Sequence, residues 1–305
     1  MIDFKPIQLS DRDWIQALLK NSDFNGAEYS FGNNFVWRDI YHIEVAQYRG
    51  FYLARSGKGE TRSYLYPAGS GDIVPVMEAL IQDAEERGMK FGVYSATKEN
   101  MALLETVMPG RFHFEENRDT FDYLYRTEKL STLAGKKYHS KRNHIARFKE
   151  NHPDWKYEPI TQDNLAECVQ MSREWCRQNA CAGDPGKRNE ACAVQERLPH
   201  FFELGYVGGL LRTEGRVVAF TMGEPLNSNT FVTHIEKAFS DIQGAYPMIN
   251  CEFAKHAVQG FEYINREDDT GAEGLRRAKL SYKPEILLEK YFIVRIAWVF
   301  GKNGN

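Results

Sequence analysis

Helical and strand-like segments follow one another in nearly the same order in the two halves of this chain. In the first half, a capped amphipathic helix near Trp14 precedes antiparallel strands over 41–66, a helix over 72–87, a strand over 90–95, a helix over 98–107 and a strand over 120–126. In the second half, a helix over 162–180 precedes a hairpin over 206–223, a strand over 230–238, a helix over 245–259, a strand over 261–265, a helix over 273–282 and a strand over 287–295. The repeated order predicts two α/β domains with mixed sheets, although no residue-level repeat accompanies it.

The predicted domain boundary lies near a turn at 151–154 that follows a basic helical stretch. We expect an N-terminal domain over 1–130, a basic linker helix over 131–152 and a C-terminal domain over 153–305 that carries the site. A length of 305 residues agrees with two domains, because one domain usually spans about 100–200 residues.

Composition and charge exclude several classes of protein. The hydrophobic fraction of 42% and the charged fraction of 27% are those of an average soluble protein. No window approaches the ~20 apolar residues that cross a bilayer, and the chain does not start like a signal peptide, so we expect a cytoplasmic protein. The net charge of −3 gives no general attraction for a polyanion. A role in binding nucleic acid therefore needs a local basic patch.

The cysteines show no spacing typical of a metal site. They contain no Cys-x-x-Cys pair, and four of them fall in one stretch. We expect free thiols in a reducing compartment and no bound metal. The five are Cys168, Cys176, Cys181, Cys192 and Cys251.

The strand over 230–238 carries the first catalytic candidates. Its period of two places His234 and Glu236 on one face. A histidine or a carboxylate can take a proton from an attacking nucleophile, so this face is a candidate site for a general base. The alternative is a histidine with satisfied hydrogen bonds beside an exposed carboxylate on a half-solvated sheet.

An acidic loop follows the next strand, where ligand sites of α/β sheets commonly lie. Asn265, Glu267 and Asp268 are predicted to bind substrate, with the carboxylates meeting a cationic group, and Asp269 is a third catalytic candidate. The alternative is that these acids cap the helix that begins after Gly271, where the helix dipole favours anions.

That helix carries a predicted cationic row. Arg276, Lys279 and Lys283 share a face at i, i+3 and i+7, while Leu275 and Tyr282 fall on a face toward the core. Such a row could hold a phosphate of CoA, of tRNA or of a lipid head group. The alternative is an ordinary solvated helix face.

The densest basic run lies from Lys136 to Lys149 and includes the predicted substrate-binding residues Lys141 and Arg142. Tyr138 and Phe148 belong to an apolar stripe that would dock the helix. The run is suited to a tRNA acceptor end or to an anionic membrane surface, because Lys and Arg neutralise phosphates. The alternative is an interdomain linker helix with a solvated face.

The segments 138–148 and 264–284 together resemble the family of the C-terminal, cytosolic domain of phosphatidylglycerol lysyltransferases. That family is built as two GNAT-like domains and is related to the Fem-type aminoacyltransferases. The resemblance implies two tandem GNAT-like domains of the acyl-CoA N-acyltransferase type. It also implies transfer of an acyl or aminoacyl group to an amine or hydroxyl of a lipid head group or small molecule.

One loop departs from the ordinary GNAT pattern. GNAT enzymes hold the CoA pyrophosphate with a Gln/Arg-x-x-Gly-x-Gly/Ala loop, and the corresponding positions here are Gln243, Gly244 and Ala245. The helix that follows could still bind an anion at its N-terminus. We expect no tightly bound cofactor, with a CoA thioester or aminoacyl-tRNA as co-substrate. The alternative function is a non-catalytic GNAT-like module that binds an anionic ligand or a partner protein.

Overall fold

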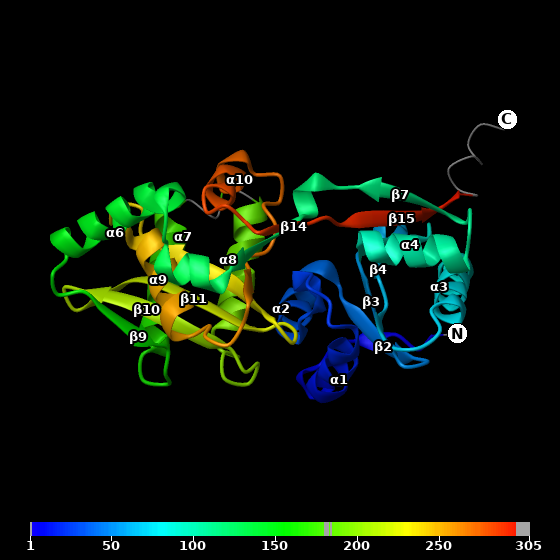
Figure 1. The fold of residues 1–305 in the computed structure, drawn as a ribbon. Coiled ribbons are helices and arrows are strands. Elements are labelled where there is room, and N and C mark those ends of the chain that lie inside the picture. The colour runs from blue at the N-terminus through cyan, green and yellow to red at the C-terminus, as the bar shows by residue number, and fades with distance from the viewer. Residues whose placement is uncertain (1, 180–182, 184, 297–305) are drawn as a thin grey trace. The chain divides into compact units, whose positions relative to one another are not determined.

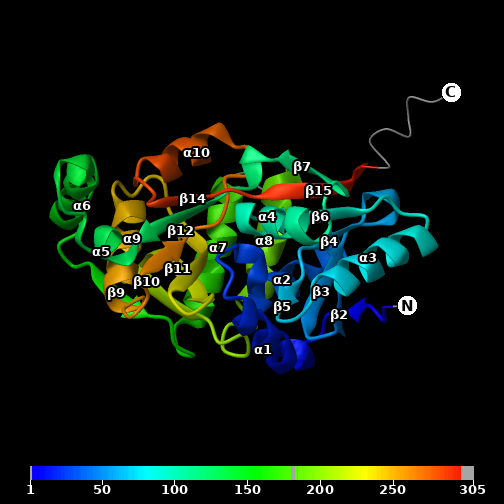
Figure 2. The ribbon, with the colours of Figure 1, turned by 45° about the vertical axis from the view of Figure 1, so that its right-hand side comes forward.

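The structure is a computed structural model that describes residues 2–179, 183 and 185–296 (Figure 1). The chain divides into two compact units. The first consists of Met1–Asp122, Asp268–Glu273 and Leu287–Asn305, and the second of Tyr123–Glu267 and Gly274–Ile286. Each unit has its own sheet (Figures 1 and 2).

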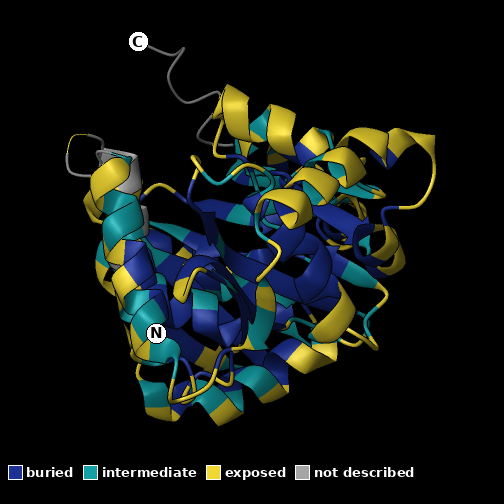
Figure 3. Ribbon diagram, turned by 90° about the vertical axis from the view of Figure 1, so that its left-hand side faces the viewer, coloured by how far each residue is buried: buried dark blue, intermediate teal, exposed yellow. Residues whose placement is uncertain are grey.

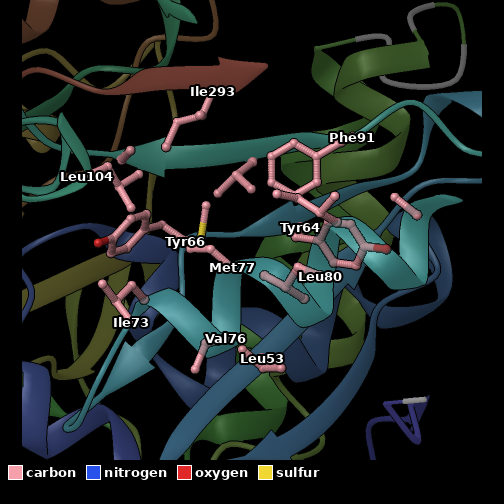
Figure 4. Close-up of a cluster of buried hydrophobic side chains, with 14 of the residues drawn as sticks. Leu53, Tyr64, Tyr66, Ile73, Val76, Met77, Leu80, Phe91, Leu104 and Ile293 are labelled. Carbon is pink, nitrogen blue, oxygen red and sulfur yellow. The ribbon is translucent and has the colours of Figure 1, made fainter. Parts of the chain in front are cut away.

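The first unit is built on a mixed sheet with the strand order β1-β2-β3-β4-β6-β15-β7, and β5 pairs with β3. Its strands are β1 (Lys5–Pro6), β2 (Glu44–Tyr48), β3 (Phe51–Ser56), β4 (Ser63–Leu65), β5 (Ala68–Gly69), β6 (Gly92–Ala96), β7 (Phe112–Glu116) and β15 (Tyr291–Arg295). Its helices are α1 (Arg12–Ser22), α2 (Phe31–Tyr41), α3 (Val74–Glu86) and α4 (Lys98–Val107). Leu80 of α3, Leu104 of α4 and Ile293 of β15 meet in one buried apolar cluster (Figure 4).

The second unit is built on a sheet with the order β14-β8-β13-β12-β11-β10-β9. Its strands are β8 (Asp122–Arg126), β9 (Lys156–Pro159), β10 (Val207–Thr213), β11 (Arg216–Pro225), β12 (Thr230–Ala238), β13 (Tyr263–Asn265) and β14 (Ile286–Leu288). The helices are α5 (Thr127–Thr132), α6 (His139–Asn151), α7 (Leu165–Gln178), α8 (Pro185–Arg197), α9 (Ala245–His256) and α10 (Glu273–Leu280). Helix α9 packs against β10, β11 and β12 and is contacted by α5 and α6.

The helices and strands of both units separate apolar from polar surface in the usual way. In Figure 3 most strand residues are buried, and the helices carry exposed residues along one side. This pattern is the one that the periodicities of two and 3.6 residues predict. In the described ranges, no helix has both the length and the apolar character that crossing a membrane requires.

Most predicted elements lie where the sequence placed them, and the differences have local causes. The strand over 230–238 has the predicted bounds. The first of the antiparallel strands expected over 41–66 begins only at Glu44, because α2 extends to Tyr41. The basic helical stretch expected before the turn at 151–154 divides into α5 and α6, because Leu133 and Gly135 adopt positive φ values of 50° and 90° and end the first helix.

The compact units do not follow the predicted boundaries of 1–130, 131–152 and 153–305. The last strand, β15, pairs with β6 and β7 in the sheet of the first unit, whereas β8 pairs with β13 in the sheet of the second. The helix expected to link two domains is α6, and it belongs to the second unit, where Phe148 is fully buried. The boundaries differ because strand pairing joins segments that are distant in the sequence.

Candidate functional site

The second unit buries several charged side chains on β12 and directly after β13. His234 and Glu236 lie two positions apart on β12, but the register with β11 shifts by one residue at His234, since Met222 pairs with Ile235 and Gly223 with Thr233. This β-bulge interrupts the alternation on which the prediction of a shared face rests. His234 bridges two carboxylates, Glu224 and Glu267, whereas Glu236 binds the guanidinium of Arg266.

His234 lies between two carboxylates and has no exposed side-chain surface. Its Nδ1 is 2.7 Å from Glu267 Oε1, and its Nε2 is 2.9 Å from Glu224 Oε1. Burial and the charge of Arg197 would lower the pKa of His234, but the hydrogen bonds to Glu224 and Glu267 raise it above its ordinary value. Both ring nitrogens can donate to carboxylates only in the imidazolium form. His234 is therefore a buried cation that joins two acids.

Glu267 is the solvent-facing end of this network. Its side chain is 29% exposed, against 4% for Glu224. Burial would raise the pKa of Glu267, but the hydrogen bond and charge of His234 hold it below its ordinary value. The carboxylate is therefore ionised at neutral pH and accessible from one side.

The backbone of Glu267 is held in an uncommon conformation, with φ of +57°. Its N–H donates to Asn265 Oδ1 at 2.7 Å. Its carbonyl oxygen accepts from the N–H of Tyr123 at 3.3 Å and from Lys279 Nζ at 3.2 Å. Several fixed contacts therefore set the position of this carboxylate.

Glu236 forms the second network and is not a free base. Its Oε1 accepts from Arg266 Nη2 at 2.8 Å, and its Oε2 accepts from Asn250 Nδ2 at 2.9 Å. Only 10% of the Glu236 side chain and 13% of the Arg266 side chain are exposed. The Arg266 guanidinium also lies 4.9 Å from the ring centroid of Tyr282. With both oxygens engaged, Glu236 holds Arg266 in place.

Of the two cations predicted from α6 to bind substrate, one adjoins this network. Lys141 is half-buried, and its Nζ lies 3.9 Å from the ring centroid of Tyr282. Burial lowers the pKa of Lys141 and the charge of Arg266 lowers it further, against the opposing effect of Glu236. Arg142 instead donates to the backbone carbonyls of Leu133 and Gly135, after the end of α5.

The predicted cationic row on α10 is wrong in its orientation. Lys279 is buried, and its Nζ donates to the carbonyl of Arg266 at 2.6 Å as well as to that of Glu267. Leu275, expected in the core, is 42% exposed. Arg276 is half-buried on the helix, and Lys283 is exposed beyond its end. The buried Lys279 donates hydrogen bonds to two backbone carbonyls just after β13. Helical periodicity does not reveal such a role.

Asp268 and Asp269 hold the turn that precedes α10. Asp268 Oδ1 accepts from the N–H of Thr270, and Asp269 Oδ1 accepts from that of Gly271, both at 3.0 Å. Asp269 is fully buried, with Oδ2 3.5 Å from Arg118 Nη1. Both aspartates belong to the first unit, whereas His234, Glu236 and Glu267 belong to the second.

The N-terminus of α9, the position of the predicted anion loop, is closely covered by α6. Gly244 has φ of +85°, and a Cβ there would lie 2.2 Å from the carbonyl oxygen of His144. Ala245 donates its N–H to the carbonyl of Ile242 at 3.2 Å, and Pro247 has no N–H to offer. Gln243 is exposed. Few backbone donors of this first turn are therefore available to a pyrophosphate.

Sequence reasoning missed the partners that give the site its chemistry. Glu224 lies near the end of β11, opposite the part of β12 that precedes the bulge at His234, and Arg197 ends α8. Neither lies in a motif that links it to His234, so pairing in three dimensions was needed to find them. Arg266 stands within the segment 264–284 that carries the family resemblance and could have been chosen from it.

The expectations about metals and thiols concern side chains elsewhere in the chain. Among the residues that the structure describes, no three His, Cys, Asp or Glu side chains gather as a metal site. Cys168, Cys176 and Cys251 are free thiols. Cys181 lies outside the described residues, and the side chain of Cys192 is not described.

Comparisons with known proteins agree on one family. The family model for phosphatidylglycerol lysyltransferase, C-terminal, matches residues 19–294. A conserved protein of unknown function from Bacteroides thetaiotaomicron VPI-5482 has a crystal structure that is 44% identical, covers 97% of this chain and 100% of that chain, and superposes with a TM-score of 0.93. An uncharacterized protein of Mycoplasmoides gallisepticum is 24% identical over 175 residues, and the match spans 55% of that protein, about half its length.

Two more distant structures show the fold. The C-terminal domain of a putative lysylphosphatidylglycerol synthetase from Agrobacterium fabrum is 14% identical, covers 93% of this chain and 91% of its own, and has a TM-score of 0.68. L-PGS from Bacillus licheniformis is 18% identical, covers 100% and 95%, and has a TM-score of 0.67. The predicted mixed α+β, GNAT-like fold class is confirmed.

Proposed function

The chain belongs to the family of C-terminal domains of phosphatidylglycerol lysyltransferases, and on that premise we propose that it transfers an aminoacyl group from aminoacyl-tRNA to an amine or hydroxyl acceptor. The acceptor is a lipid head group or a small molecule. The observation that carries the proposal is the Glu224–His234–Glu267 network, which ends in an ionised, partly exposed carboxylate.

Glu267 is suited to bind the α-ammonium group that every aminoacyl ester carries beside its reactive carbonyl. A carboxylate whose pKa is held low stays ionised, and hydrogen bonds between ammonium and carboxylate are among the strong ones. The same low pKa makes Glu267 a poor base. In this proposal Glu267 orients the aminoacyl group, and His234 positions Glu267.

Lys141 is suited to move the proton. Its lowered pKa increases the share of neutral amine at neutral pH, and a neutral amine accepts a proton. In the proposed step the acceptor amine or hydroxyl attacks the ester carbonyl while its proton passes to Lys141. The ester C–O bond then breaks, and the departing ribose oxygen takes that proton back. Arg266 and Glu236 set the charge around this lysine.

The cover over the start of α9 supports tRNA rather than CoA as the carrier. The loop at Gln243, Gly244 and Ala245 would have to cradle the CoA pyrophosphate, yet the His144 carbonyl packs on Gly244 and the Ala245 N–H is engaged. Aminoacyl-tRNA has no pyrophosphate beside its aminoacyl ester, so it does not need this loop as a binding site.

A transfer assay tests the proposal. Aminoacyl-tRNA with a labelled amino acid is incubated with the chain and with phosphatidylglycerol vesicles or small amines, and acetyl-CoA serves as the competing donor. Label should leave the tRNA and appear in an acceptor. Glu267→Gln should lower kcat/KM about 100-fold, a loss of roughly 3 kcal/mol of transition-state stabilisation. Glu214→Gln, an exposed change in a hairpin turn of the same unit, should leave the rate unchanged.

Two results would count against it. Transfer from acetyl-CoA without transfer from tRNA would make the chain an ordinary acyl-CoA enzyme. Binding of aminoacyl-tRNA without loss of the aminoacyl group would favour the non-catalytic module.

A further inference from the structure

A cavity of roughly 720 Å³ opens in the second unit between the edge strand β9 and the C-terminal end of α9. Trp155, Tyr157 and Glu158 line it from the β9 side, and Glu252 and His256 line it from α9. The polar network of His234 and Glu236 does not use these residues. The cavity therefore needs an explanation of its own.

Two aromatic side chains at the cavity, Tyr157 and His256, stack on each other, and a glycine leaves space for the Tyr157 ring. The rings of Tyr157 and His256 stack with centroids 4.9 Å apart and an interplanar angle of 23°. A Cβ on Gly209 would lie 2.3 Å from the Tyr157 hydroxyl, so that glycine leaves space for the ring. The side chain of His256 is 56% exposed. One ring of the stacked pair is thus accessible to a flat ligand.

The carboxylates that line the cavity have cationic partners. Glu252 pairs with Lys255 at 2.7 Å and with His256 at 3.2 Å, and Glu158 shares Arg212 with Glu167. Lys156 lines the cavity and Lys149 lies against Trp155, and neither has a carboxylate within ion-pair distance among the residues that the structure describes. These two lysines are suited to contact an anionic ligand.

Helix α6 connects this cavity to the polar network. Lys141 lies over Tyr282 beside Arg266, and Lys149, two turns further on, lies 5.0 Å from the ring centroid of Trp155. Eight residues of α-helix rise about 12 Å. Both lysines lie on the same side of α6. A phosphate backbone that follows this side would meet one lysine at each end.

We propose that this cavity is a stacking site for an unpaired base of an RNA strand whose phosphates run along α6. Single-stranded nucleic acid is commonly held by aromatic platforms beside basic grooves, because every base has a flat face. A membrane surface would instead meet aromatic side chains that project from the protein, whereas these line a hollow. The inference deepens the proposed function, because it places part of the RNA donor.

The test is a binding measurement on the whole chain with RNA that carries no amino acid. Fluorescence anisotropy compares a labelled hairpin that ends in unpaired CCA with the same hairpin ending blunt. His256→Ala and Trp155→Ala should each weaken binding of the unpaired end roughly 5- to 100-fold. Trp155→Phe and His113→Ala should change it less than about twofold, the latter removing an exposed histidine of the first unit. Lys149→Ala should reduce the slope of log affinity against log salt by about one.

Three outcomes would overturn the inference. They are equal affinity for the unpaired and blunt ends, full affinity in both His256→Ala and Trp155→Ala, and binding to phosphatidylglycerol vesicles with none to RNA. Because the RNA carries no aminoacyl group, the result does not depend on catalysis. If the RNA end binds by stacking but no aminoacyl transfer occurs, the proposed function is wrong and the stacking site stands. If transfer occurs and His256→Ala leaves KM unchanged, the stacking site is wrong and the proposed function stands.

Discussion

The protonation state of a single residue, His234, determines what the polar network of the second unit does. Between two carboxylates the ring carries a proton on each nitrogen, so it fixes Glu224 and Glu267 instead of accepting a proton. Removing one partner of such a buried pair leaves an uncompensated charge, which typically costs about 3–5 kcal/mol. The histidine is therefore a positioning residue on which the geometry of Glu267 depends.

The pH dependence of stability should report this cation. The raised pKa of His234 gives stability that is fully present below its ordinary pKa of about 6.5 and is lost as the pH rises through the raised value. The lowered pKa of Glu267 gives stability that is lost only as the pH falls below about 4.5 through the lowered value. Urea unfolding should therefore show His234→Gln about 3 kcal/mol less stable than the unaltered chain near pH 6, and by a smaller margin at pH 9.

The matched variant for that measurement is His113→Gln, an exposed histidine of the first unit, which should change the free energy of unfolding little at any pH. A margin for His234→Gln that grows with pH would mean that the ring is neutral in the folded state.

Among single residues, the sequence selected the two candidates on β12 but not their partners. The period of two grouped His234 with Glu236, and the β-bulge at His234 interrupts that period. Their acceptors and donors come from β11 and from the segment after β13, and no local pattern encodes those contacts. The base role predicted for either residue assumed free polar atoms, and these partners occupy them.

The contact of α6 with the start of α9 requires glycine at position 244. Gly244 combines a left-handed φ with a close approach of the His144 carbonyl. Gly135 offers a matched site, since it has φ of +90° and a Cβ added there would meet nothing within 4 Å. The pair separates the cost of backbone conformation from the cost of crowding.

Gly135→Ala should lower the free energy of unfolding by about 1–2 kcal/mol, the cost of a left-handed L-residue. Gly244→Ala should lower it by about 3 kcal/mol or more, because the methyl group must also displace backbone of α6. Denaturant titration of both variants checks this. Equal losses would show that α6 does not pack on Gly244.

Helix α10 shows why periodicity alone misplaced the cationic row. Its eight residues span about two turns, too few for an apolar stripe to determine the orientation. The backbone carbonyls of residues 266 and 267 supply partners for Lys279, and they are invisible to a pattern of side chains. Burying a lysine costs less when hydrogen bonds compensate it.

For the molecule as a whole, the order of elements was predictable and the assignment of strands to sheets was not. The sequence indicated helices and strands in nearly the observed order. It did not indicate that β15 returns to the first sheet, where Ile293 is fully buried among residues of β3, β4 and α3. Linear boundaries fail whenever a late strand pairs with early ones, because its partners are set by long-range packing.

In the proposed function the second unit holds the aminoacyl group, with Glu267 on its ammonium. A crystal structure of the chain with a stable amide analogue of an aminoacyl-adenosine tests this placement. We expect the analogue's ammonium nitrogen about 3 Å from a Glu267 oxygen, with His234 still bridging Glu224 and Glu267. An analogue bound with its ammonium away from Glu267, or held by the first unit, would contradict it.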